Sequence, residues 1–269
     1  MRTIVHLSDT HFGRVDPAII DPIVGIIRDI KPDLVAVSGD LTQRARSLQF
    51  KEARAFLERL PTPQIIVPGN HDIPLHNVFS RFFRPLRKYR EYITTDMQPF
   101  YFDEEIAVLG VTTARSLTIK GGRINEEQVA VMREKLCALS GDITKVIVSH
   151  HPFDLPESQD EGDIAGRSGM AMQAFAECGA DVFLAGHLHV SHTGQTARNY
   201  QISGYSALVV QAGTATSTRS RGEANSFNVI RIEPAKIVVE CFTWQREQSG
   251  FASSLTERFC KGTEGWVRT

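Results

Sequence analysis

Short apolar runs that each end in aspartate, asparagine or histidine constrain the fold of this 269-residue chain more than any other feature of its sequence. One of these runs, residues 182–184, leads into the segment Gly186-His187-Leu188-His189. Side chains at positions i and i+2 of an extended chain point the same way, so the two histidines can reach one small volume. Four more runs end in the same manner, at Asp9 with His11, at Asp40, at Asn70 with His71 and Asp72, and at His150 with His151. The repetition predicts one site assembled from the ends of five strands.

Apolar runs and helical spacings alternate along the first third of the chain. The predicted strands of this part cover residues 3–8, 34–37 and 65–67. Isoleucines with helical spacing fill residues 19–30, between the first two strands. This alternation implies parallel strands with covering helices, whereas the pattern from Thr193 onward is all β. The expected fold class is therefore α/β with a β-rich second half.

The expected domain organisation is one main domain with an insert and an extension. Residues 1–244 form the domain, and residues 75–98 form a helical, cap-like insert rich in aromatic and basic side chains. Either the charges of this insert face water, or they attract an anionic substrate. Residues 245–269 have weak periodicity and are expected as a C-terminal extension that packs as a flap or frays. The polar stretch 152–169 predicts a long loop, which is a common place for functional residues.

Composition and charge exclude several classes of partner. The formal net charge of −1 does not indicate a nucleic-acid or membrane surface as partner, no nucleic-acid motif is evident, and no apolar run is long enough to span a bilayer. The start of the chain does not resemble a signal peptide. The cysteines are scattered, which favours reduced thiols in a cytoplasmic protein: they are Cys137, Cys178, Cys241 and Cys260. The oligomeric state stays open, with a homodimer as one alternative.

The polar side chains at the strand ends form a donor set for metal ions. Ligands of open α/β sheets lie at the carboxyl ends of the strands, where all of these side chains are expected. The seven candidate metal ligands are Asp9, His11, Asp40, Asn70, His150, His187 and His189. Oxygen and imidazole donors without thiolate suit zinc, manganese or iron. Seven donors are too many for one tetrahedral ion, and they suit two ions ~3.5–4 Å apart that share a bridging carboxylate.

The ordered motifs resemble those of the calcineurin-like metallophosphoesterase superfamily. Its pattern reads D-x-H, G-D, G-N-H-D/E, a histidine and then G-H-x-H, and every part is present here in order, over residues 4–215. The segment Ser149-His150-His151-Pro152 is similar to the bacterial phosphodiesterase branch, which includes cyclic-nucleotide and glycerophosphodiester hydrolases. The resemblance implies a four-layer α/β/β/α sandwich with two mixed β-sheets. It also implies hydrolysis of a small anionic phosphoester by in-line attack of a metal-held hydroxide.

The resemblance also implies roles for the candidate metal ligands, His71 and Asp72, and the position of the other candidates in the sequence leaves alternatives open. The first ion would be held by Asp9, His11, Asp40 and His189, and the second by Asp40, Asn70, His150 and His187. His71 would stabilise the phosphoryl oxygens or protonate the leaving group, and Asp72 would orient it. His151 would contact the substrate, pack in the core, or form a hydrogen bond that supports a metal ligand. Thr214 is expected near the pocket or in tight backbone packing. Loop residues that would bind an anionic group, or else be solvated, are Arg115, Arg123, Arg219, Arg221 and Asn225.

Three functions are compatible with these motifs. The first is a dinuclear phosphodiesterase for a small substrate such as a cyclic nucleotide or a glycerophosphodiester. The second is a pyrophosphatase for a nucleotide-linked lipid precursor, with the aromatic insert as an acyl-binding cap. The third is a scaffold of the same fold without catalysis, which should have lost ligands or His71; the sequence retains all of them.

Overall fold

A computed structural model describes residues 1–75, 77–116, 121–155, 161–196, 202, 204–219, 222–263 and 265–269. Arg221 and residues 156–160 of the predicted loop therefore lie outside the described residues. Within these ranges, no helix is both long and apolar enough to cross a membrane.

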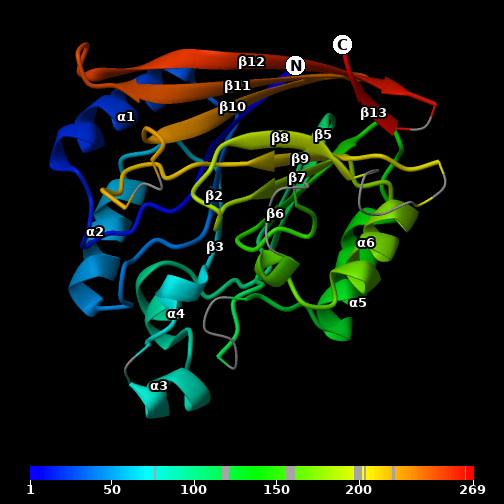
Figure 1. Ribbon diagram of the computed structural model, residues 1–269. Coiled ribbons are helices and arrows are strands. Elements are labelled where there is room, and N and C mark those ends of the chain that lie inside the picture. Colours follow the sequence, from blue (N-terminus) through cyan, green and yellow to red (C-terminus); the bar gives the residue numbers. More distant parts are fainter. Residues whose placement is uncertain are drawn as a thin grey trace.

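Two mixed sheets form the centre of the molecule (Figure 1). The first has the order β13-β12-β11-β10-β1-β2-β3, with β1 (Arg2–Leu7), β2 (Leu34–Ser38), β3 (Gln64–Val67), β10 (Ser226–Glu233), β11 (Lys236–Gln245), β12 (Gly250–Gly262) and β13 (Gly265–Arg268). The second has the order β4-β5-β6-β7-β9-β8, with β4 (Phe100–Phe102), β5 (Ile106–Val111), β6 (Thr144–Ser149), β7 (Val182–Ala185), β8 (His192–Gln195) and β9 (Leu208–Gln211). In each sheet parallel strands are continued by antiparallel ones.

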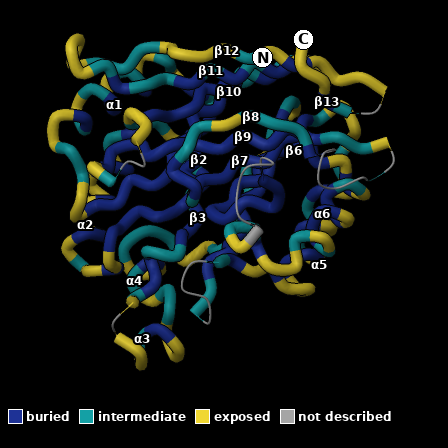
Figure 2. The backbone as a smooth tube through the Cα atoms, viewed as in Figure 1, coloured by how far each residue is buried: buried dark blue, intermediate teal, exposed yellow. Residues whose placement is uncertain are grey.

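Helices cover the outer face of each sheet. The first sheet is covered by α1 (Pro17–Ile30) and α2 (Ser47–Leu57), and the second by α5 (Glu126–Leu136) and α6 (Ser168–Glu177) (Figure 1). Alternation along β1 shows how the layers are joined, because Ile4 packs between the two sheets and Val5 packs toward α1 and α2. The central strands β2, β5, β6, β7 and β9 are buried on both faces, whereas β12 is largely exposed (Figure 2). The predicted four-layer α/β/β/α sandwich with two mixed sheets is confirmed.

Two short helices occupy the segment predicted as a helical insert. They are α3 (Val78–Phe83) and α4 (Arg87–Tyr92), at the lower edge of the molecule in Figure 1. Tyr89 of α4 is fully buried and donates a hydrogen bond to the carbonyl oxygen of Ile66, 2.9 Å away. In contrast, α3 exposes its aromatic side chains: Phe79 is 68% exposed and Phe83 is 72% exposed. The segment thus presents apolar as well as charged side chains to water.

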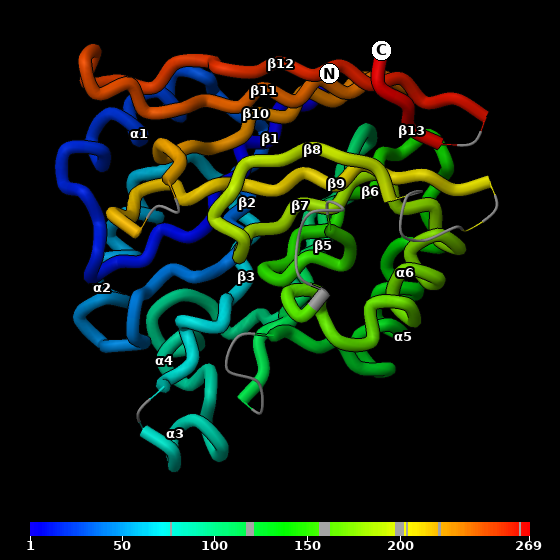
Figure 3. The backbone as a smooth tube through the Cα atoms, viewed as in Figure 1, coloured from blue at the N-terminus to red at the C-terminus, as the bar shows by residue number. Residues whose placement is uncertain are grey.

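The residues expected as a C-terminal extension belong to the first sheet. The predicted boundary at residue 244 falls inside β11, and β12 and β13 continue the sheet beyond it (Figure 3). Trp266 and Phe259 from these strands are both 1% exposed and join the core between the sheets. The expected flap or frayed end is therefore wrong, because these strands bury large apolar side chains.

Two of the four cysteines form a disulfide, between Cys137 and Cys178. They stand directly after the last residues of α5 and α6, which are adjacent in the outer layer. Cys241 and Cys260 are free. The expectation of four reduced thiols is wrong for the first pair, so the inference of a cytoplasmic location from reduced thiols loses its support.

Candidate metal centre

The seven predicted ligands converge at one edge of the sandwich, where strands of both sheets end. The first sheet supplies Asp9 and His11 after β1, Asp40 after β2 and Asn70 after β3. The second sheet supplies His150 after β6, and His187 and His189 after β7. Ligand atoms of Asp9, His11, Asp40 and His189 lie within 4.8 Å of one another, as do those of His150, His151 and His187. The structure therefore supports two neighbouring groups of donors.

The backbone at five of the seven ligands is left-handed. The φ angles are 52° at Asp9, 47° at His11, 52° at Asp40, 74° at His187 and 59° at His189. Residues other than glycine rarely adopt this conformation, which costs energy and concentrates at functional sites. These turns follow the strand ends, and the ligand atoms that they carry converge at the edge of the sandwich.

The first group surrounds a carboxylate oxygen that lacks a hydrogen bond. Asp9 Oδ1 lies 3.1 Å from His189 Nε2 and 3.4 Å from His11 Nε2, and it is buried without a hydrogen-bond partner in the described part of the chain. Burial raises the pKa of Asp9, but the facing histidines outweigh burial and hold that pKa well below its usual range. A buried anionic oxygen that faces two imidazole nitrogens fits a metal cation at this position.

Asp40 lies between the two groups. Its Oδ2 is 3.9 Å from His11 Nε2 in the first group and 3.4 Å from His150 Nε2 in the second. His150 Nε2 also lies 3.0 Å from Asn70 Oδ1. Burial lowers the pKa of His150, but Asp40 outweighs burial and raises it to about 9. Asp40 therefore faces donors of both groups.

Backbone carbonyl groups orient the imidazole rings. His150 Nδ1 donates to the carbonyl oxygen of Ser38 at 2.8 Å, and His189 Nδ1 donates to that of Arg219 at 3.1 Å. These bonds orient each ring so that Nε2 faces the centre, where a bound ion would replace any proton on that nitrogen. The second oxygen of Asp9 accepts hydrogen bonds from the Ser8 hydroxyl at 2.6 Å and from the His187 amide at 3.0 Å.

Two of the motif glycines are required by close packing. A Cβ at Gly186 would lie 1.8 Å from Ser8 Oγ and 2.6 Å from Asp9 Oδ2. A Cβ at Gly69 would lie 2.1 Å from Asp40 Oδ1. Any larger residue at either position would displace a ligand carboxylate.

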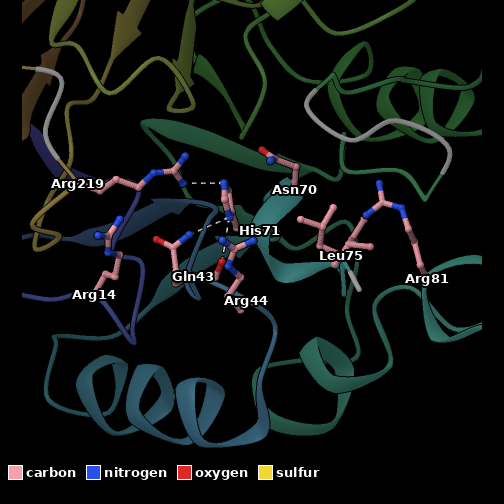
Figure 4. Close-up of a pocket in the computed structure, with 9 residues that line it drawn as sticks. Arg14, Gln43, Arg44, Asn70, His71, Leu75, Arg81 and Arg219 are labelled. Carbon is pink, nitrogen blue, oxygen red and sulfur yellow. Dashed lines mark hydrogen bonds between the residues drawn. The ribbon is translucent and has the colours of Figure 1, made fainter. Parts of the chain in front are cut away.

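His71 lies beside the first group and faces a cavity. Its ring is 5.0 Å from that of His11, between centroids. Its Nδ1 donates to the carbonyl oxygen of Gln43 at 3.0 Å, and its Nε2 accepts a hydrogen bond from Arg219 Nη1 at 2.8 Å (Figure 4). Burial lowers the pKa of His71, and Arg219 lowers it further, although Asp40 acts in the opposite direction. The resting side chain is therefore a neutral imidazole with Nε2 directed at the cavity.

Asp72 does not orient His71, contrary to the expectation from the motif. Its oxygens accept hydrogen bonds from the amides of Leu41, Thr42 and Gly69, at 2.9 to 3.1 Å, and from the Thr42 hydroxyl at 3.0 Å. Asp72 thus joins the loops after β2 and β3, because it is buried and needs these donors. The carbonyl group of Gln43 orients the His71 ring instead.

The three residues predicted to contact substrate lie in different surroundings. His151 is buried in the second group of donors, with Nδ1 2.8 Å from the Thr113 hydroxyl. Arg115 is half-buried and donates to Gln128 in α5. Thr214 is 3% exposed, and its carbonyl oxygen accepts hydrogen bonds from Ser226 and Asn225. Among the described residues none of the three lines the cavity beside His71, and a substrate contact by any of them stays a prediction.

Several residues near the site were not selected from the sequence. The cavity of about 560 Å³ beside His71 is lined by Arg14, Gln43, Arg44 and Ile73, which were not selected, by Leu75 and Arg81 of the predicted insert, and by Asn70 and Arg219, which were selected (Figure 4). Asp163, in the short helix η2 (Glu161–Asp163), has Oδ1 3.4 Å from His187 Nε2. Asp163 belongs to the polar loop predicted over residues 152–169. The length and polarity of that loop were the features of the sequence that could have pointed to it.

Comparisons with known proteins agree with this geometry. The model of a family described as calcineurin-like phosphoesterase matches residues 2–191. A glycerophosphodiester phosphodiesterase, GpdQ of Enterobacter lignolyticus, is 27% identical over 187 residues, which are 65% of this chain and 65% of that protein. A probable cyclic nucleotide phosphodiesterase of Ruthia magnifica is 28% identical over 110 residues, which are 36% of this chain and 46% of that protein. The chain thus spans less than two thirds of the length of either curated relative.

Solved structures with similar folds share little sequence with this chain. The purple acid phosphatase PPD1 of yellow lupin superposes with a TM-score of 0.70 at 12% identity, over 95% of this chain and 53% of that chain. A dimetal phosphatase from Danio rerio superposes with a TM-score of 0.66 at 15% identity, over 89% of this chain and 95% of that chain. These similarities concern the fold.

Proposed function

Because the chain belongs to the calcineurin-like phosphoesterase family, we propose that it is a dinuclear metal-dependent phosphodiesterase for a small substrate of the cyclic-nucleotide or glycerophosphodiester type. The observation that carries the proposal is Asp40, which stands between two groups of buried donors. The resemblance to a glycerophosphodiester phosphodiesterase and to a probable cyclic nucleotide phosphodiesterase supports the diester substrate class. A scaffold without catalysis would not need seven converging ligands and an unaltered His71.

The donor set determines which ions would be held. Asp9, His11, Asp40 and His189 would hold the first ion, and Asp40, Asn70, His150 and His187 the second. Carboxylate, amide and imidazole donors suit manganese, iron or zinc. A bound pair of such ions activates water at neutral pH and polarises phosphoryl oxygens.

The remaining side chains would act on the substrate directly. His71 presents Nε2 to the cavity, and once this nitrogen has taken up a proton it is placed to protonate a leaving alkoxide. Arg219 donates to that nitrogen in the free protein and offers further N–H groups to phosphoryl oxygens. Gln43 fixes the ring by accepting from Nδ1.

A substrate panel on metal-reconstituted protein tests the proposal. We expect turnover of bis(p-nitrophenyl) phosphate, and of cyclic AMP or a glycerophosphodiester, with about two ions bound per chain by elemental analysis. The matched control is p-nitrophenyl phosphate, a monoester with the same leaving group. Exclusive hydrolysis of the monoester would reject the diester assignment, and a chain that binds one ion or none would reject the dinuclear site.

A second candidate function is favoured by α3. Its exposed Phe79 and Phe83 lie on the same short helix as Arg81, which lines the cavity. Such a surface suits the acyl chains of a nucleotide-linked lipid precursor whose pyrophosphate bond is cleaved at the same ions. Hydrolysis of a nucleotide-diphosphate lipid at a kcat/KM far above that of its deacylated analogue would favour this function. Equal rates for the two would reject it.

A further inference from the structure

Four arginines converge on the cavity beside His71. Arg14 follows β1, Arg44 follows β2, Arg81 lies in α3, and Arg219 follows β9. In Figure 4 they surround His71, with Arg14 and Arg219 on one side and Arg81 on the other. Segments far apart in the sequence therefore place positive charge around one cavity.

Three of these arginines have no carboxylate partner among the described residues. No aspartate or glutamate of that part of the chain lies within ion-pair distance of the side chains of Arg14, Arg44 or Arg219. Other exposed arginines are paired, for example Arg54 with Glu58 and Arg133 with Glu177. Like charges that share a cavity repel one another, so an anion that enters it is attracted.

Arg81 adds a buried charge to the same wall. It is 7% exposed, and its Nη1 lies 3.4 Å from the carbonyl oxygen of Pro74. Its neighbours on α3, Phe79 and Phe82, are 68% and 49% exposed. This helix thus buries its arginine against the cavity and leaves its aromatic residues in water, which is opposite to the usual distribution of these residue types.

We propose that this cavity binds a second phosphate group of the substrate, separate from the phosphoryl group that is hydrolysed. The inference rests on the proposed function, because it places the scissile group at the metal centre, beside Asn70 and His71, which also line the cavity. Arg14 and Arg44 then remain for another anion, and Arg81 adds positive charge to the same wall. A guanidinium group binds phosphate through paired N–H donors, so the chemistry favours phosphate over an uncharged or cationic substituent.

The inference predicts how substrates with the same scissile bond rank by kcat/KM. Among glycerophosphodiesters, we expect kcat/KM to rise from glycerophosphocholine, with its cationic substituent, through glycerophosphoglycerol to glycerophosphoinositol 4-phosphate. The advantage of the phosphorylated diester over glycerophosphoglycerol should be about tenfold or more, the effect of one charge-assisted hydrogen bond. Higher salt should reduce this ratio, because screening weakens exposed charge pairs.

Substitutions identify the residues responsible. Arg14→Gln and Arg44→Gln should each lower the ratio of the two kcat/KM values by part of this factor of about ten, and the double variant should remove the preference. The matched control is Arg246→Gln, in the turn between β11 and β12, which should leave the ratio at its wild-type value. Because a ratio is compared, partly misfolded protein in a preparation does not alter the result.

Equilibrium binding separates this inference from the proposed function. Isothermal titration calorimetry of metal-loaded protein should show about tenfold tighter binding of adenosine 3′,5′-bisphosphate than of adenosine 5′-monophosphate, and the double variant should remove the difference. If no diester is hydrolysed but the bisphosphate is preferred, the proposed function fails and the inference stands. If diesters are hydrolysed but neither the ratio nor the binding responds to the second phosphate, the inference is wrong.

Discussion

At the scale of residues, Asp40 and His71 separate metal binding from turnover. Asp40 faces both groups of donors, so Asp40→Ala should lose metal and activity together. His71 faces the cavity, so His71→Ala should keep its metal content and lose turnover by about 10²–10⁴-fold, the usual contribution of a positioned acid or base. Elemental analysis and steady-state kinetics on the same preparations provide the measurement. A His71→Ala protein without metal would show that its assigned role is wrong.

A second prediction at this scale concerns His6, which is buried in β1 with Nε2 2.8 Å from the Ser38 hydroxyl. Burial lowers the pKa of His6 to about 3, although Asp9 acts in the opposite direction. An unfolded chain protonates histidine below pH about 6.5, whereas the folded protein keeps His6 neutral down to about 3. The free energy of unfolding should therefore fall as the pH falls through this window, by up to about 1.4 kcal/mol per pH unit from this group.

The variant His6→Gln tests this linkage, because an amide replaces the ring without titrating. Urea unfolding at pH 7.5 and at pH 5 should show a smaller loss of stability in the variant than in the wild type. The control is His192→Gln, at an exposed position in β8. Its free energy of unfolding should change between the two pH values as that of the wild type does. An equal loss of unfolding free energy between the two pH values in His6→Gln and in the wild type would contradict the burial of a neutral His6.

At the scale of elements, the disulfide joins the ends of α5 and α6 across 41 residues of sequence. Closing a loop of this length should stabilise the fold by about 4 kcal/mol through the entropy of the unfolded chain. Cys137→Ala with Cys178→Ala should lose about that amount, and a reductant should have the same effect on the wild type and none on the variant. Denaturant unfolding measures the difference.

The control for that prediction is Cys260→Ser, because Cys260 is free and exposed. Its unfolding curve should match that of the wild type in the presence and absence of reductant. Alkylation followed by mass spectrometry counts the free thiols. Four alkylated cysteines in the unreduced protein would show that the pair is not bonded.

The elements that position the metal centre could be predicted from sequence because each has a local signal. The apolar runs before Asp9 and Asp40 are buried strands and the run before Asn70 is a partly buried one, and their carboxyl ends meet by the rule for parallel sheets. β12 gave no such signal, because residues 253–256 are exposed and their pattern does not alternate. Its membership of the sheet depends on pairing with β11, which residue periodicity does not reveal.

The surroundings of the candidate catalytic histidine could not be predicted for a related reason. Arg219 lies 148 positions from His71, and Gln43 contacts it from the loop after β2. Both contacts depend on loop conformation rather than on strand periodicity. The motif alone suggested Asp72 as the partner, but its oxygens are occupied by backbone amides of the neighbouring loops.

At the scale of the whole molecule, Trp266 joins the two sheets. Its indole Nε1 donates to Asp181 Oδ1 at 2.9 Å, just before β7, and its carbonyl oxygen accepts from Gln195 in β8 at 2.7 Å. Trp266→Ala should lower the free energy of unfolding by about 3–5 kcal/mol, as expected for loss of a buried aromatic residue. The neighbouring variant Val267→Ala, at a position 49% exposed, should change it little. Equal effects of the two in denaturant unfolding would contradict the core position of Trp266.

The metal centre takes its ligands from both halves of the sandwich, with Asp9, His11, Asp40 and Asn70 from one sheet and His150, His187 and His189 from the other. The bound ions would therefore link the two sheets at their interface. A chain whose two sheets have not packed together has an incomplete set of ligands and would not bind the ions. Correct assembly would thus be a condition of reactivity, so a misassembled chain would be inert rather than an indiscriminate hydrolase.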